Sequence, residues 1–298
     1  MARFVGSVVA LAAIAGITGW IVTSPADLDA DTKQALGRVT ADPQRGEDVF
    51  WAAGCASCHA ANGATGEEKL ILSGGQRFAT DFGTFIAPNI SPDPLTGIGG
   101  WTLEDFTRAV TQGVSPGGQH YYPAFPYTAY QHMTLQDVAD LKAFMDTLPH
   151  ADVPSAPAEV GFPFNIRRGM GAWKALYMKD EWVLDTSDPQ LTRGRYLVEA
   201  LAHCGECHTP RGPLGGLDTS AWLAGAPNPD GRGTVPDITP GALTWPADDI
   251  TYYLETGFTP DFDSAGGKMA SVVDNFSHLS GEDRAAVAAY LKAIPPVN

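Results

Sequence analysis

Cysteine and positive charge are both scarce in this sequence. It has four cysteines in 298 residues, and 19 Lys and Arg against 34 Asp and Glu, which gives a formal net charge of −15. Phosphate backbones repel a chain this acidic, so nucleic acid is excluded as a partner. For the same reason, we expect any protein that docks on this chain to present a basic surface.

The few cysteines fall into two copies of one motif, C-x-x-C-H. The copies are Cys55-Ala-Ser-Cys58-His59 and Cys204-Gly-Glu-Cys207-His208. This pattern is typical of covalent haem c attachment, in which each thiol binds a haem vinyl group and the following His binds the iron. A thioredoxin-like pair would need a βαβ setting, and a zinc site would need cysteines about 150 residues apart to converge. We therefore predict two covalently bound haem c groups and no disulfide.

Long hydrophobic runs are also rare, and the most prominent one lies at the N-terminus. Residues 4–22 contain no charged side chain. As a helix they would span roughly 28 Å, close to the ~30 Å hydrocarbon thickness of a bilayer. We predict that residues 1–24 form a single-pass anchor in a bacterial inner membrane, with the haem domains in the periplasm, where c-type haems are assembled. A cleaved signal peptide is the alternative.

The rest of the sequence is duplicated at a nearly constant spacing of about 150 residues. The matched segments are Arg45-Gly46 with Arg193-Gly194, Pro88-Asn89-Ile90-Ser91-Pro92 with Pro236-Asp237-Ile238-Thr239-Pro240, and Asp137 to Pro149 with Asp283 to Pro295. In each copy we expect a helix that leads into the cysteine motif, over about 43–54 and 193–203. A Gly/Pro-rich loop, a middle helix and a terminal helix follow, the last over about 134–148 and 280–294, capped by Thr134 and Ser280.

First and last helices that cross beside a haem are the layout of class I cytochromes c. The loops resemble those of the cytochrome c subunits of proteobacterial membrane-bound alcohol and sugar dehydrogenases, and more closely their two-haem relatives. The segments that carry the resemblance are Asn89-Ile90-Ser91-Pro92-Asp93, Thr96-Gly97-Ile98-Gly99, Tyr122-Pro123-Ala124-Phe125-Pro126-Tyr127 and His203-Cys204-Gly205-Glu206-Cys207-His208-Thr209-Pro210-Arg211. It implies a mainly α fold, with tandem cytochrome c domains over residues 40–150 and 191–298.

Residues 151–190 lie between the predicted domains. Apolar side chains recur here at helical spacing, which predicts a helix that packs across both domains and fixes their orientation. They are Ile166, Met170, Trp173 and Tyr177. A small basic cluster of Arg167, Arg168 and Lys174 accompanies them, and we expect it to face either haem propionates or solvent.

The two motif histidines are the predicted proximal iron ligands. A ligand ring usually donates its second N–H to a fixed acceptor, which sets its tautomer. We expect the carbonyl of Pro88 to accept from His59, and that of Pro236 to accept from His208, because both prolines belong to matched segments.

The sixth ligand decides what each haem does. A Met thioether closes the site and makes an electron carrier, whereas an open position permits chemistry on a small molecule. We predict Met269 for the second haem. For the first haem we predict Met133, with His120 or His132 as alternatives. Many relatives carry a Met where this chain has Phe125, so the first domain departs from their pattern.

Two closed haems describe an electron-transfer protein with no catalytic residue. The resemblance implies transfer between a dehydrogenase or quinol-linked donor and a downstream carrier or terminal oxidase. Expected partners are therefore redox proteins: a dehydrogenase, a quinol oxidoreductase, a soluble cytochrome or an oxidase. The alternatives are a dihaem peroxidase-type enzyme, which would need one haem that opens for peroxide, and a two-haem subunit of a terminal oxidase.

Overall fold

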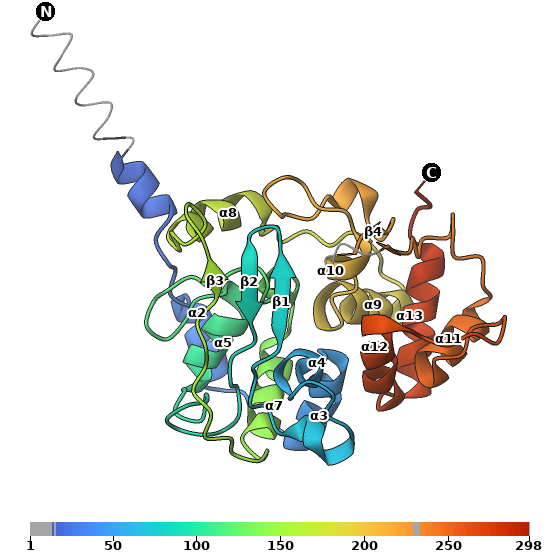
Figure 1. Ribbon diagram of the computed structural model, residues 1–298, viewed down its shortest axis with the longest axis horizontal. Helices are drawn as coiled ribbons and strands as arrows, with labels where there is room; N and C mark the ends of the chain where they lie inside the picture. Colours follow the sequence, from blue (N-terminus) through green and yellow to red (C-terminus); the bar gives the residue numbers. More distant parts are fainter. Residues whose placement is uncertain (1–13, 15, 229–232, 298) are drawn as a thin grey trace, which may run out of the picture.

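The computed structural model describes residues 14, 16–228 and 233–297 of the chain, which fold mainly into helices grouped in two lobes (Figure 1). The first lobe is defined here as residues 30–149 and the second as residues 189–297. The first contains α2 (Ala30–Leu36), α3 (Pro43–Ala52), α4 (Cys55–His59), η1 (Gly66–Leu70), β1 (Arg77–Thr80), β2 (Gly83–Ile86), α5 (Leu103–Gln112), α6 (Tyr127–Tyr130) and α7 (Leu135–Met145). The linker contains β3 (Glu159–Val160) and α8 (Gly169–Tyr177).

The second lobe repeats the helical plan of the first. It contains α9 (Pro189–Arg195), η2 (Tyr196–Leu201), α10 (Gly205–His208), η3 (Thr219–Ala221), β4 (Ala226–Pro227), β5 (Thr234–Val235), α11 (Ala247–Thr256), α12 (Gly267–Ser277) and α13 (Gly281–Ala293). The predicted order of first, middle and terminal helices is therefore confirmed in both lobes. The short strands and α12 were not predicted. The strands have only two to four residues, and runs this short carry little periodic signal.

The helix that leads into the cysteine motif starts in the same way in both lobes. The Asp42 side chain caps α3, with Pro43 at the first helical position, and Asp188 and Pro189 do the same for α9. An Asp cap satisfies a free N–H, and Pro needs no hydrogen bond at that position. This cap places the start of α9 four residues earlier than predicted, and the helix then continues through the π-helical turn η2.

The first and last helices of each lobe cross at a glycine. A Cβ added to Gly46 would lie 2.0 Å from the carbonyl oxygen of Asp140 in α7. In the second lobe, a Cβ added to Gly194 would lie 2.1 Å from the carbonyl oxygen of Ala286 in α13. Only glycine permits backbones to approach this closely, so the matched Arg-Gly pairs of the sequence mark two equivalent crossings. The predicted crossing of the helix before the cysteine motif with the terminal helix is confirmed in both lobes.

The linker touches both lobes. Its strand β3 extends the antiparallel β1–β2 pair of the first lobe into a three-stranded sheet. In α8, the indole N–H of Trp173 donates to the carbonyl of Leu214 in the second lobe at 2.9 Å, while its ring meets Tyr127 of the first lobe edge-on. These contacts hold the two lobes in one relative orientation.

The predicted basic cluster makes contacts with other parts of the chain. The Arg168 guanidinium lies over the ring of Trp20 and donates to its carbonyl at 2.6 Å. Lys174 donates to two carbonyls at the end of α5, and Arg167 donates to the carbonyl of His120 at 3.2 Å. The cluster therefore fastens α8 to the segment that precedes the first lobe and to the lobe itself.

The predicted single-pass inner-membrane anchor is corrected by the structure. Among the described residues, no helix is long and apolar enough to cross a membrane. Residues 14 and 16–24 of the predicted anchor belong to this described part of the chain. The remainder of the predicted anchor, residues 1–13 and 15, lies outside the described residues.

Candidate haem sites

The first cysteine motif forms the short helix α4, directly after α3. Gly54 joins them in the left-handed conformation, with φ of 65°. The thiols of Cys55 and Cys58 form no disulfide. Nδ1 of His59 lies 2.9 Å from the Pro88 carbonyl oxygen, which confirms the predicted contact. Because a carbonyl only accepts, Nδ1 carries the proton and Nε2 is the nitrogen with a free lone pair.

The second motif repeats this geometry in α10. Nδ1 of His208 lies 2.8 Å from the Pro236 carbonyl oxygen, so this predicted contact is also confirmed. Burial lowers the pKa of both motif histidines, which keeps the rings neutral and able to bind a metal. Gly205 stands between the cysteines because a Cβ there would lie 2.2 Å from the ring of Trp222.

The thiols suit haem attachment better than disulfide exchange. Burial raises the pKa of Cys55 to about 12, and burial likewise raises that of Cys204 to about 12. A redox-active thiol pair needs the opposite shift, toward a thiolate at neutral pH. Each motif thus offers two neutral thiols and a neutral imidazole with its Nε2 available, which is the donor set that a haem c requires.

The two motifs lie close together, and each is held by the opposite lobe. In the first motif, Ser57 Oγ accepts a hydrogen bond from Asn275 Nδ2 of α12 at 2.8 Å. In the second, Glu206 Oε1 accepts one from Thr128 Oγ1 of α6 at 3.1 Å. Burial raises the pKa of Cys58, the charge of Lys268 lowers it, and Cys207 raises it. Because Cys207 belongs to the second motif, thiols of the two motifs lie near enough to affect each other's charge.

Other contacts between the lobes surround this pair of motifs. The ring of Trp51 in α3 stacks on His278, with centroids 3.8 Å apart and planes within 4°. Lys69 forms an ion pair with Asp274 of α12. The hydroxyl of Tyr196 donates to the carboxylate of Asp137 in α7. The sequence offered no signal for these contacts, because each joins residues from different repeats.

The predicted sixth ligands occupy different surroundings. Met269 lies in the first turn of α12 and is partly exposed, whereas Met133 lies just before α7 and is 6% exposed in the hydrophobic core. The duplication sets Met133 opposite the core residue Leu279, and sets Met269 opposite Phe125. Among the residues that the structure describes, no hydrogen bond or ring contact joins either methionine to a motif histidine, so both assignments stay predictions.

The two alternative histidines of the first lobe are engaged elsewhere. Nε2 of His120 lies 3.1 Å from the Thr23 carbonyl oxygen, and its Nδ1 lies 3.1 Å from Lys174 Nζ. His132 stacks on the ring of Trp182, with centroids 4.3 Å apart. With both ring nitrogens occupied, His120 has no lone pair to offer an iron.

A buried carboxylate beside the second motif was missed by sequence reasoning. Glu199 lies on η2 and is 6% exposed. Its Oε1 accepts from the Tyr290 hydroxyl at 2.7 Å, and that hydroxyl accepts from Trp222 Nε1 at 3.0 Å. Burial raises the pKa of Glu199. A single Glu in an otherwise apolar helix was the available signal, since Trp51 occupies the matching position in the first repeat.

Two such centres on two crossed-helix lobes define a dihaem electron carrier. The family model described as cytochrome c matches the chain twice, over residues 43–149 and 191–295. The chain belongs to the cytochrome c family, carries two covalently bound haem c groups and transfers electrons without being an enzyme. The domain bounds 40–150 and 191–298 stay predictions beside these matched ranges.

Three relatives show the breadth of the similarity. The chain is 56% identical over 298 residues to a dihaem cytochrome c-type protein of Cereibacter sphaeroides, and covers 100% of both chains. It is 39% identical to the fructose dehydrogenase cytochrome subunit of Gluconobacter japonicus, covering 84% of this chain and 52% of that one. It is 34% identical to the cytochrome c subunit of a quinone alcohol dehydrogenase of Gluconobacter oxydans, covering 94% and 61%. The chain thus spans little more than half of the dehydrogenase subunits.

Proposed function

We propose that this dihaem cytochrome c accepts electrons from a dehydrogenase or quinol-linked donor at one haem and delivers them from the other to a downstream carrier or terminal oxidase. The observation that carries the proposal is the exchange of contacts around the motifs, in which Ser57 and Glu206 are each held by the opposite lobe. Attachment sites fixed to each other in this way keep two cofactors at one short separation.

Each motif holds its cofactor through three residues. We assign Cys55 and Cys58 as thioether attachments of the first haem and His59 as its proximal ligand. The matching set for the second haem is Cys204, Cys207 and His208. When bound, each haem supplies a one-electron iron couple. The Pro88 and Pro236 carbonyls orient the rings and raise their basicity as ligands.

For the sixth positions we propose Met269 in the second lobe and Met133 in the first. Met145, the other methionine of the first lobe, is disfavoured because it is the last residue of α7 and is buried in the hydrophobic core at 3% exposure. His120 is disfavoured because both of its ring nitrogens are engaged. A thioether at each iron would close both sites to small molecules and leave electron transfer as their chemistry.

Charge supports a basic partner. The chain has a net charge of −15, so a partner of opposite sign would be steered toward it. The rate of association should then fall as ionic strength rises, because salt screens charges separated by more than about 8–10 Å.

An optical redox titration of the haem-loaded chain, with and without carbon monoxide, tests the proposal. We expect two low-spin transitions and no spectral change with carbon monoxide. Met269→Ala should convert one haem, and Met133→Ala the other, to a form that binds carbon monoxide. A wild-type haem that binds carbon monoxide would refute the closed carrier, and an unchanged spectrum in Met133→Ala would refute that ligand alone.

A further inference from the structure

The duplicated lobes each carry the same hairpin after the middle helix. We name residues 113–121 the first hairpin and residues 257–265 the second hairpin. Their backbone hydrogen bonds match: Tyr121 N to Gly113 O (2.7 Å) and Ser115 N to Gln119 O (2.8 Å) in the first, Ala265 N to Gly257 O (2.8 Å) and Thr259 N to Asp263 O (2.9 Å) in the second. The two hairpins are therefore directly comparable, residue by residue.

The first hairpin is covered by another segment of the chain. From α8, Lys174 Nζ donates to the carbonyl oxygens of Gln112 at 2.6 Å and Gly113 at 2.8 Å, where α5 ends. Val114 is 1% and His120 4% exposed, and His120 contacts the Thr23 carbonyl oxygen and Lys174 Nζ, each at 3.1 Å. The helix α8 therefore contacts the first hairpin through Lys174, both at the end of α5 and at His120.

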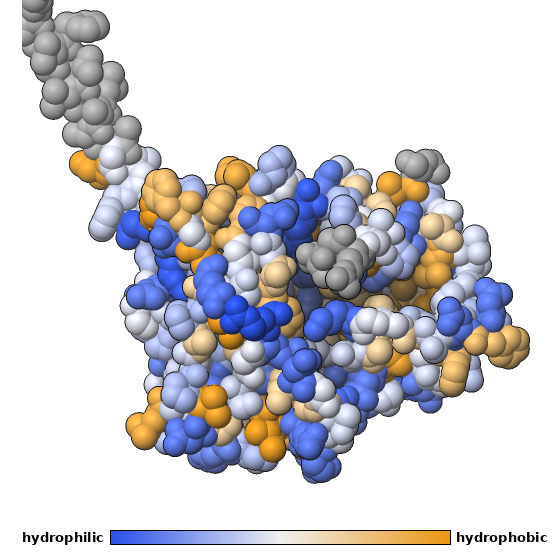
Figure 2. Space-filling view, viewed as in Figure 1, coloured by the Kyte–Doolittle hydropathy of each residue, from blue (hydrophilic) through white to orange (hydrophobic). Residues whose placement is uncertain are grey.

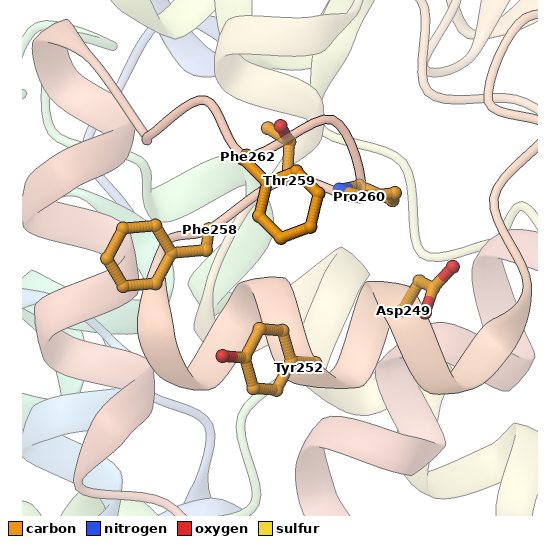
Figure 3. A pocket seen from close by; sticks show the side chains of 6 residues that line it. All are labelled: Asp249, Tyr252, Phe258, Thr259, Pro260 and Phe262. Atoms are coloured by element: carbon orange, nitrogen blue, oxygen red, sulfur yellow. The ribbon is translucent and has the colours of Figure 1, made fainter.

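The second hairpin has the same shape but lacks such a cover. Phe258, which corresponds to Val114, is 52% exposed, and Phe262 is 95% exposed. With Tyr252 of α11, which is 55% exposed, they form a group that we name the aromatic face. Figure 3 shows these rings around a hollow of about 350 Å³ between the hairpin and α11. In the described part of the chain, no side chain donates to the carbonyls of Thr256 or Gly257.

Phe262 adds a second observation at the same place. Its φ is 65°, a conformation that residues with a Cβ adopt rarely. The matching position of the first hairpin is Gly118, with φ of 74°, which adopts it freely. An exposed phenyl ring held in an unfavourable backbone conformation points to a role in contact with another molecule.

The surroundings of the aromatic face are acidic. Residues 247–265 contain five acidic residues and no Lys or Arg. They are Asp248, Asp249, Glu255, Asp261 and Asp263, of which Glu255 forms an ion pair with Arg284 at 3.0 Å. Most of the surface seen in Figure 2 is hydrophilic, with apolar side chains also at the outer edge of the second lobe. A second copy of this acidic chain or an anionic lipid surface would be repelled here.

We propose that the aromatic face binds an amphipathic helix of a redox partner protein, with a lysine of that helix donating to the carbonyls at the end of α11. The partner helix lies on the second hairpin as α8 lies on the first, and its basic charge complements the acidic rim. This inference rests on the proposed electron-carrier function. Ala265, which ends the second hairpin, is four residues from Met269, so they are at most about 14 Å apart along the chain.

The test uses a synthetic peptide with the sequence of residues 165–178, which contains α8, and the full haem-loaded chain. Fluorescence anisotropy of the labelled peptide measures binding at low and high salt. We expect one peptide to bind per chain, more weakly as salt rises. Phe262→Gly, which copies Gly118, should weaken binding about tenfold, as loss of an aromatic anchor does. A peptide with Gln in place of Lys174 should bind more weakly than the original.

Leu95→Gly is the matched control, because Leu95 is 92% exposed in a loop of the first lobe. It should leave peptide binding unchanged. Absent binding, or equal binding by Phe262→Gly, overturns the inference. Dimers in sedimentation that Phe262→Gly abolishes would assign the face to a second copy, and phosphatidylglycerol vesicle binding that it abolishes would assign it to lipid; both outcomes also overturn it. If the redox titration shows two low-spin haems but the peptide does not bind, the docking inference fails and the proposed electron-carrier function stands.

Discussion

Replacing Gly46 by Ala tests the helix crossing that positions the first haem motif. The added Cβ would lie 2.0 Å from the Asp140 carbonyl oxygen and 2.8 Å from the Cβ of Phe144. Ordinary contact would require α3 and α7 to move apart by about 1.5 Å. The same movement would strain the bond from Arg45 Nε to the buried Asp140 carboxylate, which is now 2.8 Å long. One neighbour is a backbone oxygen and the other is a Cβ, so no side-chain rotation relieves these contacts.

The expected cost follows from these contacts. Overpacking against a fixed backbone costs about 3 kcal/mol, at the upper end of the usual range. Alanine is favoured over glycine in a helix by about 1 kcal/mol, which offsets part of that cost. We therefore expect Gly46→Ala to lower the free energy of unfolding by about 2 kcal/mol or more, a large share of the 5–15 kcal/mol typical of a domain.

Guanidinium unfolding of the haem-loaded chain, followed by circular dichroism and the Soret band, measures this change. Gly37→Ala is the control: its φ is −65°, and the nearest atom to an added Cβ is the Gln34 carbonyl oxygen at 3.5 Å. It should be neutral or stabilising by up to about 1 kcal/mol. A free energy for Gly46→Ala within about 0.5 kcal/mol of wild type would show that the helices do not cross as described.

Three further predictions concern buried and inter-lobe contacts. Tyr290→Phe should destabilise the chain by about 1–3 kcal/mol in the same assay, since it leaves the partly buried Trp222 Nε1 without an acceptor and removes one donor from Glu199, which keeps the N–H groups of Val183 and Leu184; an unchanged midpoint would contradict it. Because burial raises the pKa of Glu199, its contribution is full below the ordinary Glu pKa of 4.5 and is lost as pH rises through the folded pKa. Wild type should thus lose stability relative to Glu199→Gln above pH 4.5, and parallel pH profiles would be the opposite result. Lys69→Met should lower the free energy of unfolding by at most about 1 kcal/mol, because the ion pair of Lys69 with Asp274 is partly exposed. A larger decrease would show that this ion pair is a main contact between the lobes.

Local patterns were enough to establish the cofactors and the repeat. The C-x-x-C-H spacing places two thiols and an imidazole on one turn of chain, whatever surrounds them, so the haem prediction needed no tertiary information. The Pro88 and Pro236 carbonyls were also predicted, because the duplication marked both segments. Caps such as Thr134 and Ser280 act within four residues and located the terminal helices.

The N-terminal prediction failed because hydropathy measures composition alone. The pattern of residues 4–22 suits a membrane helix, yet among the described residues no helix is long and apolar enough to cross a membrane. Trp20, which belongs to this stretch, lies beneath the Arg168 guanidinium, whose carbon is 3.5 Å from the centroid of the Trp20 ring. Partners of this kind come from distant parts of the chain, which a window of neighbouring residues does not contain.

Tertiary structure alone decided how the two repeats differ. Equivalent hairpins follow α5 and α11, but Lys174 and the rest of α8 cover only the first and leave Phe258 and Phe262 of the second exposed. Likewise Asn275 and Thr128 hold the motif of the opposite lobe. A repeated sequence encodes the same local fold twice, because backbone bonds and caps are short-range. Which copy is buried depends on contacts between distant segments, and those exist only once the chain has folded.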